Sequence, residues 1–326
     1  MPSSSAKQDD DLGDKKASLD AKEPTQTDYI IAGVAYSICA ATLLVINKAA
    51  VDLTPSPAVV VASQLGFAAL FARLLIGCDT VDGEVLVWDK VKAFIWVSLL
   101  FTLCLVCNVK ALAATSVQTV IVMRSCSPIF VALFDWKFLG TGAPLPATWG
   151  CLFGIAVGAY VYVHFDKGME VDTYLWPVVY FVSICIEMVF VKHIINTVKM
   201  TTWTRVYYNN VLGFLPTIAF GFMFNEYEGL SETVPEAYSF EWWNRVVILV
   251  VSCCIGLAIS FAGFHARTLL SATSFTVLGV ANKVISIFLS LFFFGGMANG
   301  IKWESLVGLF MCIGFGTAYA KTLPNK

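Results

Sequence analysis

The sequence is poor in charged residues: of its 326 residues only 13% are Asp, Glu, Lys or Arg, whereas 58% are apolar. Soluble domains carry about 25% charged and about 45–50% apolar residues. The mean hydropathy of +0.75 is also too high for a soluble chain. The composition therefore excludes an ordinary water-soluble enzyme and indicates an integral membrane protein. Because one span needs about 20 residues, a bundle of this length leaves little room for a soluble catalytic domain.

Several chemical signatures are also missing. The sequence has no Asn-x-Ser/Thr sequon, and no cleavable signal peptide precedes the first apolar run near Tyr29. We expect that run to act as a signal anchor. Cys104 and Cys107 form a C-x-x-C without a second pair, and the three histidines are scattered. We therefore predict no metal site, no redox site and no cofactor.

What the chain has instead is a series of long apolar runs. Lipid cannot satisfy backbone hydrogen bonds, and the alternating pattern of barrel strands is absent, so each run predicts a helix. Residues 1–28 are rich in Ser, Asp and Lys and are predicted to be a disordered tail. We predict an all-α membrane protein with ten transmembrane helices, over residues 29–49, 56–77, 92–110, 116–138, 147–164, 174–197, 203–225, 244–264, 270–294 and 303–321.

The basic residues are distributed unevenly between the two sides. With the amino terminus in the cytosol, 14 of the 21 Lys and Arg residues fall on the cytosolic side and four on the other. The remaining three, Lys48, Arg124 and Lys283, fall inside spans. Cytosolic loops are enriched in Lys and Arg. Both termini are therefore predicted to be cytosolic, with residues 323–326 forming the carboxyl-terminal end.

The sequence also contains a partial copy of itself. The stretch 114–116 (Ala-Thr-Ser) recurs at 272–274, and the same offset of 158 gives 12 identities over the 45 positions from 114 to 158. The copy matches the fourth and fifth helices to the ninth and tenth, which predicts two five-helix repeats, 29–164 and 165–322. A unit with an odd number of helices enters the membrane the opposite way up the second time. Inverted repeats are typical of alternating-access carriers that bind substrate near the midplane.

Two polar positions fall at the same depth of the repeat. Lys283 lies in the middle of the ninth helix, and the neighbouring Asn282 corresponds to Arg124. A cation at the bilayer centre costs about 2.5–3.5 kcal/mol on insertion scales, so it should face a cavity or a partner. Two inward cations suit a ligand with several negative charges, such as a nucleoside diphosphate. The alternative is that Arg124 or Lys283 pairs with a buried carboxylate, Glu187 or Asp135.

The seventh helix carries the tetrad Tyr207-Tyr208-Asn209-Asn210. An Asn side chain offers both an acceptor oxygen and a donor amide, which matches the donors and the carbonyl on the edge of guanine. Uracil would leave some of these groups unpaired, and unpaired buried groups discriminate strongly. The alternative is that the two amides form hydrogen bonds between helices.

Further candidates lie on the eighth and ninth helices. The eighth helix has a stripe of small residues that includes Ser260, and the ninth has Phe275 and Gly279 on one face. Small residues allow helices to approach closely. Ser260 is a candidate hydrogen-bonding group and Phe275 a candidate ring for stacking on a base or sugar. Lys48, near the lumenal end of the first helix, either snorkels to the interface or faces the cavity.

The tetrad at 207–210 resembles the F-Y-N-N motif of Golgi GDP-mannose transporters, and the stretch 279–283 (GVANK) resembles their G-A-L-N-K motif. The stretches 187–193 and 259–283 look especially like plant-type GDP-sugar transporters. The resemblance implies the ten-helix drug/metabolite-transporter fold and exchange of cytosolic GDP-sugar for lumenal GMP across the Golgi membrane. It also implies that the two Asn residues contact guanine and that the second motif faces the sugar and phosphates. Because 280–281 depart from the motif, mannose, fucose, galactose and arabinose all remain open.

The resulting prediction is a GDP-sugar:GMP antiporter with membrane lipid around it, no nucleic-acid partner and no catalytic residue. Whether it forms a homodimer is left open. Alternatives are a UDP-sugar or triose-phosphate antiporter of the same superfamily and a membrane glycosyltransferase. The predicted substrate-binding residues are Tyr208, Asn209, Asn210, Ser260, Phe275, Gly279, Asn282, Lys283 and Arg124.

Overall fold

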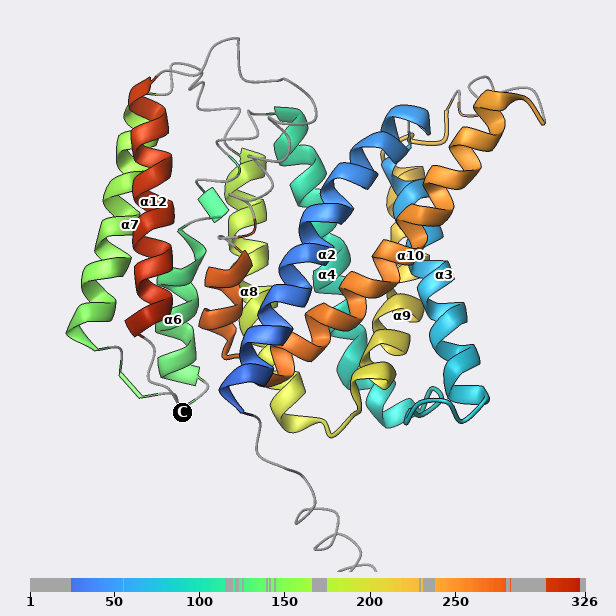
Figure 1. Cartoon of the computed structure of the whole chain (residues 1–326), viewed down its shortest axis with the longest axis horizontal. Helices are drawn as coiled ribbons and strands as arrows, with labels where there is room; N and C mark the ends of the chain where they lie inside the picture. The colour runs from blue at the N-terminus through green and yellow to red at the C-terminus, as the bar shows by residue number, and fades with distance from the viewer. Residues whose placement is uncertain are drawn as a thin grey trace, which may run out of the picture.

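The structure is a computed structural model, and within its described residues the chain is helical and contains no strand. The described residues are 25–54, 56–114, 120, 123–124, 126–138, 140, 142–143, 145–165, 175–228, 230, 238–279, 282 and 303–322. The helices (Figure 1) are α2 (Gln26–Leu53), α3 (Pro57–Gly77), α4 (Trp88–Ala114), α6 (Ser127–Phe138), α7 (Pro146–Phe165), α8 (Leu175–Thr197), α9 (Thr202–Met223), α10 (Phe240–Leu269) and α12 (Trp303–Thr322). Each coincides with one of the predicted apolar runs, which confirms the all-helical prediction for this part of the chain.

Five of the described helices are long and apolar enough to cross a membrane. They are α2, α3, α8, α10 and the stretch Trp88–Asn108 of α4. α7 and α12 contain shorter apolar stretches, Pro146–Tyr162 and Phe310–Tyr319. The predicted ninth span, 270–294, is described only at 270–279 and 282. The membrane character follows from these helices, while the number of ten spans stays a prediction.

The first helix begins at Gln26, three residues earlier than the sequence predicted. The Asp28 carboxylate accepts hydrogen bonds from the backbone N–H of Thr25 (2.7 Å) and from its hydroxyl (2.8 Å). The first turn of a helix leaves backbone donors unsatisfied, and a carboxylate at the third helical position commonly binds one of them. Residues 25–28, predicted as part of the tail, are therefore the cap and first turn of α2.

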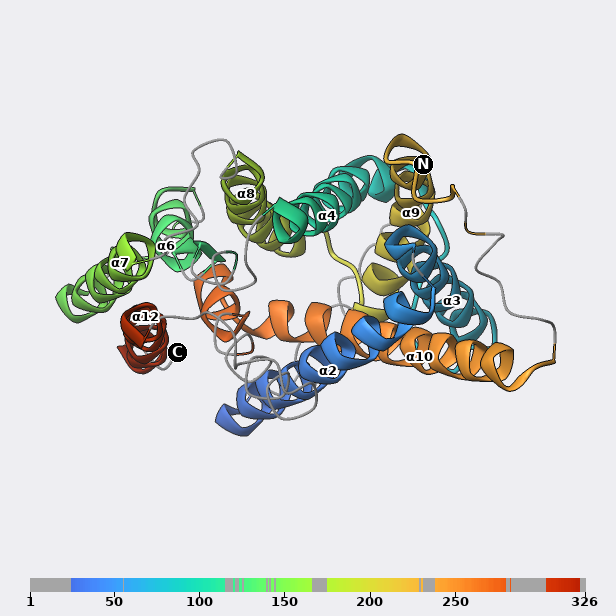
Figure 2. The same cartoon turned by 90° about the horizontal axis from the view of Figure 1, so that it is seen from above.

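The helices pack in pairs along the molecule (Figures 1 and 2). α7 lies against α12 at one end, and α3 lies against α9 and α10 at the other. Between them, α2 packs against α10, and α4 packs against both α8 and α9. Leu215 and Phe222 of α9 expose more than half of their side-chain surface on the outside, as a surface in contact with lipid requires.

Glycines set the closest of these helix contacts. A Cβ atom built on Gly308 of α12 would lie 2.6 Å from the carbonyl oxygen of Gly158 in α7, and the reverse distance is 2.9 Å. Both distances are shorter than a carbon–oxygen contact tolerates, so only glycine fits at this crossing. Small residues that let backbones meet are a common basis of helix association in lipid.

Candidate functional site

The predicted Asn pair is buried where α9 faces α10. Asn209 is 4% exposed and Asn210 is 2% exposed. The Asn210 side-chain amide donates to the Val206 carbonyl (2.7 Å) and to the Ser260 hydroxyl (2.9 Å). The Asn209 side-chain oxygen has no hydrogen-bond partner. The structure thus brings Asn210 and Ser260 together and leaves the buried oxygen of the adjacent residue, Asn209, without a partner, which is costly.

Tyr208, the residue before the pair, points to a different part of the molecule. Its hydroxyl accepts a hydrogen bond from the Val87 N–H (2.6 Å) and donates one to the Val85 carbonyl (3.0 Å). Its ring meets Phe94 edge-on at 6.0 Å between centroids. The side chain is fully buried. Tyr208 therefore anchors the segment that leads into α4 and does not share the surroundings of Asn210 and Ser260.

The second group of predicted residues gathers around Arg124. Its Nη1 atom donates to the Tyr180 hydroxyl of α8 (2.7 Å). A Cβ atom on Gly279 would lie 3.3 Å from Nη2 of Arg124, so the missing side chain leaves space for the guanidinium. Asn282 is buried, and both polar atoms of its side chain lack a hydrogen-bond partner. The structure thus places the Arg124 guanidinium beside Gly279, while Asn282, three residues further along the sequence, is a buried amide without a partner.

Among the described residues no carboxylate pairs with Arg124. Glu187 is held by Arg267, whose Nη1 and Nη2 atoms lie 2.8 and 3.3 Å from its two oxygens. Asp135 accepts hydrogen bonds from the backbone N–H (2.9 Å) and the hydroxyl of Thr273. The alternative that Arg124 pairs with Glu187 or Asp135 is therefore wrong for the structure described. Both carboxylates are bound elsewhere, so the guanidinium keeps its positive charge for another ligand.

Phe275 joins this region to α2. Its ring lies 4.8 Å from that of Tyr36 between centroids, and the Arg267 guanidinium lies 4.7 Å from the Phe275 centroid. Gly263 of α10, three residues after Ser260, faces the Tyr36 ring, with 3.6 Å between a built Cβ and the ring. Phe275 is 2% exposed, so in this conformation its faces are occupied by protein groups rather than open to a ligand.

The sequence did not identify Tyr36, Tyr180 and Arg267 as site residues, although each contacts a predicted site residue. Tyr180 and Glu187 are seven residues apart and share one face of α8, which is the signal that could have pointed to Tyr180. Lys283 lies outside the described residues, as does the side chain of Lys48. Their predicted roles stay predictions.

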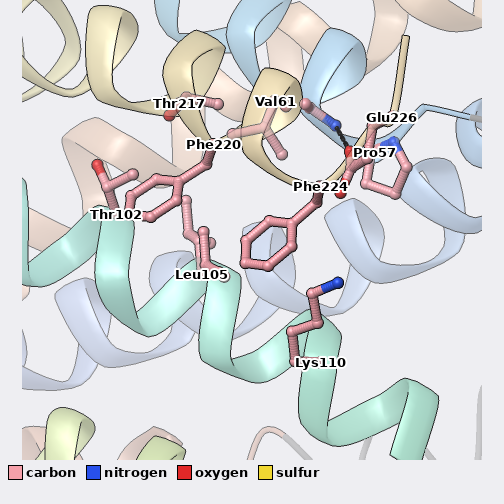
Figure 3. A pocket seen from close by; sticks show the side chains of 12 residues that line it. Pro57, Val61, Thr102, Leu105, Lys110, Thr217, Phe220, Phe224 and Glu226 are labelled. Carbon is pink, nitrogen blue, oxygen red and sulfur yellow. Dashed lines mark hydrogen bonds between the residues drawn. The ribbon is translucent and has the colours of Figure 1, made fainter. Parts of the chain in front are cut away.

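A separate pocket lies between α3, α4 and α9 (Figure 3). Its walls are largely apolar, and the Lys110 ammonium lies 3.7 Å from the centroid of the Phe224 ring. Glu226 accepts a hydrogen bond from the Ala58 N–H at the start of α3 (2.7 Å). Thr217 lines the pocket two turns after Asn210. None of the predicted site residues lines it, so the pocket is distinct from both groups above.

Next to this pocket, Tyr227 in the turn after α9 donates its hydroxyl to the Ile218 carbonyl (3.1 Å). Burial, followed by the nearby Glu226 charge, raises the pKa of the Tyr227 phenol above its ordinary value. Tyr227 therefore remains a neutral donor at physiological pH.

Comparison with known proteins identifies a transporter family and transporters as relatives. The model of the Triose-phosphate Transporter family matches residues 30–319. The GDP-fucose transporter 1 of Arabidopsis thaliana is 31% identical over 312 residues, which cover 94% of this chain and 88% of its own. The GDP-mannose transporter GONST3 of the same plant is 32% identical over 293 residues, covering 89% and 77%.

More distant matches follow. The UDP-sugar transporter UST74c of Drosophila melanogaster is 23% identical over 190 residues, covering 57% of this chain and 48% of its own. A solved crystal structure superposes with a TM-score of 0.59 at 16% identity, covering 88% of this chain and 98% of that one. At this identity the likeness supports the fold alone.

Proposed function

The chain belongs to the triose-phosphate transporter family, and from this premise we propose that it exchanges cytosolic GDP-sugar for lumenal GMP. Because the family and the relatives named above are transporters, the chain is a transporter and not an enzyme. This membership counts against the glycosyltransferase alternative. Two features carry the proposal. The buried side chains of Asn209 and Asn282 have polar atoms without a hydrogen-bond partner, and the Arg124 guanidinium forms no ion pair with a described carboxylate.

The base end of the ligand is proposed to bind at α9 and α10. Asn210 is already oriented by its bonds to Val206 and Ser260, so it costs little further entropy to bind a base. The unpaired Asn209 oxygen is suited to accept from a guanine N–H. A uracil edge would present different groups, so UDP-sugars should bind less well.

The phosphate end is proposed to bind between Arg124 and the ninth predicted helix. An Arg guanidinium binds phosphate oxygens through parallel hydrogen bonds. Asn282 adds a buried amide without a hydrogen-bond partner, and Lys283 adds a second cation by its place in the sequence. GMP and every GDP-sugar share the guanine and at least one phosphate, which is why one site serves both directions of exchange.

The transport cycle is proposed to be alternating access between two inverted five-helix repeats. In this scheme α2, α3 and α4 of the first repeat correspond to α8, α9 and α10 of the second. The contact between α2 and α10 then has the contact between α8 and α4 as its counterpart, and α3 with α10 has α9 with α4. All four of these helix pairs are in contact. Adding the 158-residue offset to α7 gives residues 304–323, and α12 spans Trp303–Thr322. Arg124 and Asn282 correspond under the offset, and Arg124 lies beside Gly279, three residues before Asn282 in the sequence. These correspondences support a site on the axis between the repeats.

The location proposed for the chain is the Golgi membrane, with both termini in the cytosol. The motif resemblance supports the compartment, and the excess of Lys and Arg in the predicted cytosolic loops supports the orientation.

The proposal is tested by uptake into proteoliposomes preloaded with GMP. Labelled GDP-mannose, GDP-fucose, GDP-galactose and GDP-arabinose are compared with UDP-sugars and triose phosphate, and vesicles loaded with UMP serve as the control. We expect uptake of at least one GDP-sugar that depends on internal GMP. Uptake of UDP-sugar or triose phosphate with none of GDP-sugar would refute the assignment.

A further inference from the structure

Tyr180 is the described side chain that holds Arg124. It lies in α8 and is 2% exposed, and its hydroxyl oxygen lies 2.7 Å from Nη1 of Arg124. The two residues are 56 positions apart in the sequence. Neither motif that identifies the site contains Tyr180.

We infer that Tyr180 is a positioning residue for Arg124 and thereby sets the affinity for the phosphate end of the ligand. The inference rests on the proposed function, since it assigns a role within the same site. Its physical basis is the cost of ordering: a free Arg side chain loses about 2 kcal/mol of rotamer entropy when it is fixed. A hydroxyl that orients the guanidinium before binding removes part of that cost from the binding step.

The bond to Tyr180 leaves most N–H donors of the Arg124 guanidinium available for a ligand. Arg carries five N–H donors, and Tyr180 accepts from Nη1 alone. The other terminal nitrogen, Nη2, faces the space left by the missing side chain of Gly279. Tyr180 can therefore hold one terminal nitrogen of Arg124 while the other donors of the guanidinium stay available for phosphate oxygens.

A buried carboxylate lies on the same face of α8 as Tyr180. Glu187 lies two turns further along α8, where Arg267 binds both of its oxygens. If Arg124 were free to swing, it could share that carboxylate and lose its attraction for an anion. The Tyr180 bond and the Arg267–Glu187 pair thus leave Arg124 without an ion pair among the described residues.

The test is a double-mutant cycle with Tyr180→Phe and Arg124→Gln in the full-length protein, read out as Kd for GMP and for guanosine. Tyr180→Phe should weaken GMP binding about tenfold, the loss expected for one hydrogen bond to a charged group, and leave guanosine within about twofold. In the Arg124→Gln background Tyr180→Phe should change the Kd for GMP no further. Tyr227→Phe, which also removes one bonded phenol hydroxyl, should leave both Kd values unchanged.

Each outcome decides the inference. If Tyr180→Phe weakened the binding of GMP and guanosine equally, Tyr180 would only support the fold. The same conclusion would follow if the effects of Tyr180→Phe and Arg124→Gln on the free energy of GMP binding were additive. Should Tyr180→Phe fail to fold, Arg124→Lys probes the same contact from the other side: it keeps the charge, loses the fork geometry, and should weaken GMP but not guanosine. Wild-type protein that neither binds nor exchanges GMP would overturn the proposed function itself. Wild-type exchange with Tyr180→Phe equal to Tyr227→Phe would overturn this inference alone.

Discussion

At the scale of single residues, neighbours in one motif serve different tasks. Successive side chains on an α-helix point about 100° apart, so Tyr208 reaches the backbone at Val85 and Val87 while Asn210 reaches Ser260. The sequence located the tetrad and predicted the residue types suited to a guanine edge. It could not assign Tyr208 to a structural contact, because the partner segment before α4 lies about 120 residues away.

The Asn pair gives the first prediction at this scale. Asn209→Ala and Asn210→Ala should each weaken GMP and all GDP-sugars by the same factor, about tenfold, because the base is common to them all. Inhibition constants for GMP and for two GDP-sugars measure the effect. Ser260→Ala should act in the same direction but less strongly, since Asn210 keeps its bond to Val206. Unchanged inhibition by GMP in both Asn variants would contradict the base assignment.

A second residue prediction concerns the cation of the GVANK stretch. Lys283→Ala should abolish exchange, while the binding of guanosine, which has no phosphate, should change little. Transport assays and guanosine binding on the same preparation test this directly. If guanosine binding fell in parallel with exchange, Lys283 would have a structural role instead.

At the scale of helices, the packing of α9 depends on the Tyr208 anchor. Tyr208→Phe removes the hydroxyl that accepts from the Val87 N–H and donates to the Val85 carbonyl, just before α4. We expect a loss of about 1–2 kcal/mol in the free energy of unfolding, measured by thermal or chemical unfolding in detergent. Tyr207→Phe on the neighbouring position is the matched control, and equal stability of the two variants would argue against the anchor.

The ion pair between α8 and α10 gives the other prediction for these elements. The Glu187 side chain is 3% exposed, so Arg267→Gln would leave a carboxylate buried without its partner. This should cost about 3–5 kcal/mol of stability. The double variant with Glu187→Gln should recover much of the loss, because no charge is then left unpaired. Failure of the second substitution to recover any stability would contradict the pairing.

That pair marks a limit of prediction from sequence. Mid-span position identified Glu187 and Arg124 as residues in need of a partner, and their opposite charges made them plausible partners for each other. The structure instead joins Glu187 to Arg267, 80 positions away, and Arg124 to a neutral phenol. Charge alone could not separate these options, because the choice depends on how α8 and α10 cross.

At the scale of the whole molecule, long apolar runs predicted the described helices well, since lipid permits few alternatives. Several boundaries differed by a few residues: α2, α4 and α10 begin three or four residues earlier than predicted, and α10 ends five residues later. At α2 the Thr25 and Asp28 cap extends the helix into polar sequence. The internal repeat predicted two corresponding five-helix units, and that correspondence stays a prediction. The gathering of Arg124, Tyr180 and Gly279 could not be foreseen, because it is a tertiary contact among three distant segments.

The central claim is that one chamber binds guanine at the Asn pair and phosphate at an uncompensated Arg124. Its most direct test compares the binding of GMP, guanosine and UMP to purified wild-type protein and to Arg124→Gln. We predict that wild-type protein binds GMP at least about tenfold more tightly than guanosine and than UMP. Arg124→Gln should reduce the preference for GMP over guanosine while keeping guanosine affinity. Equal affinities of the wild-type protein for GMP and UMP, or an unchanged preference for GMP over guanosine in Arg124→Gln, would contradict the account.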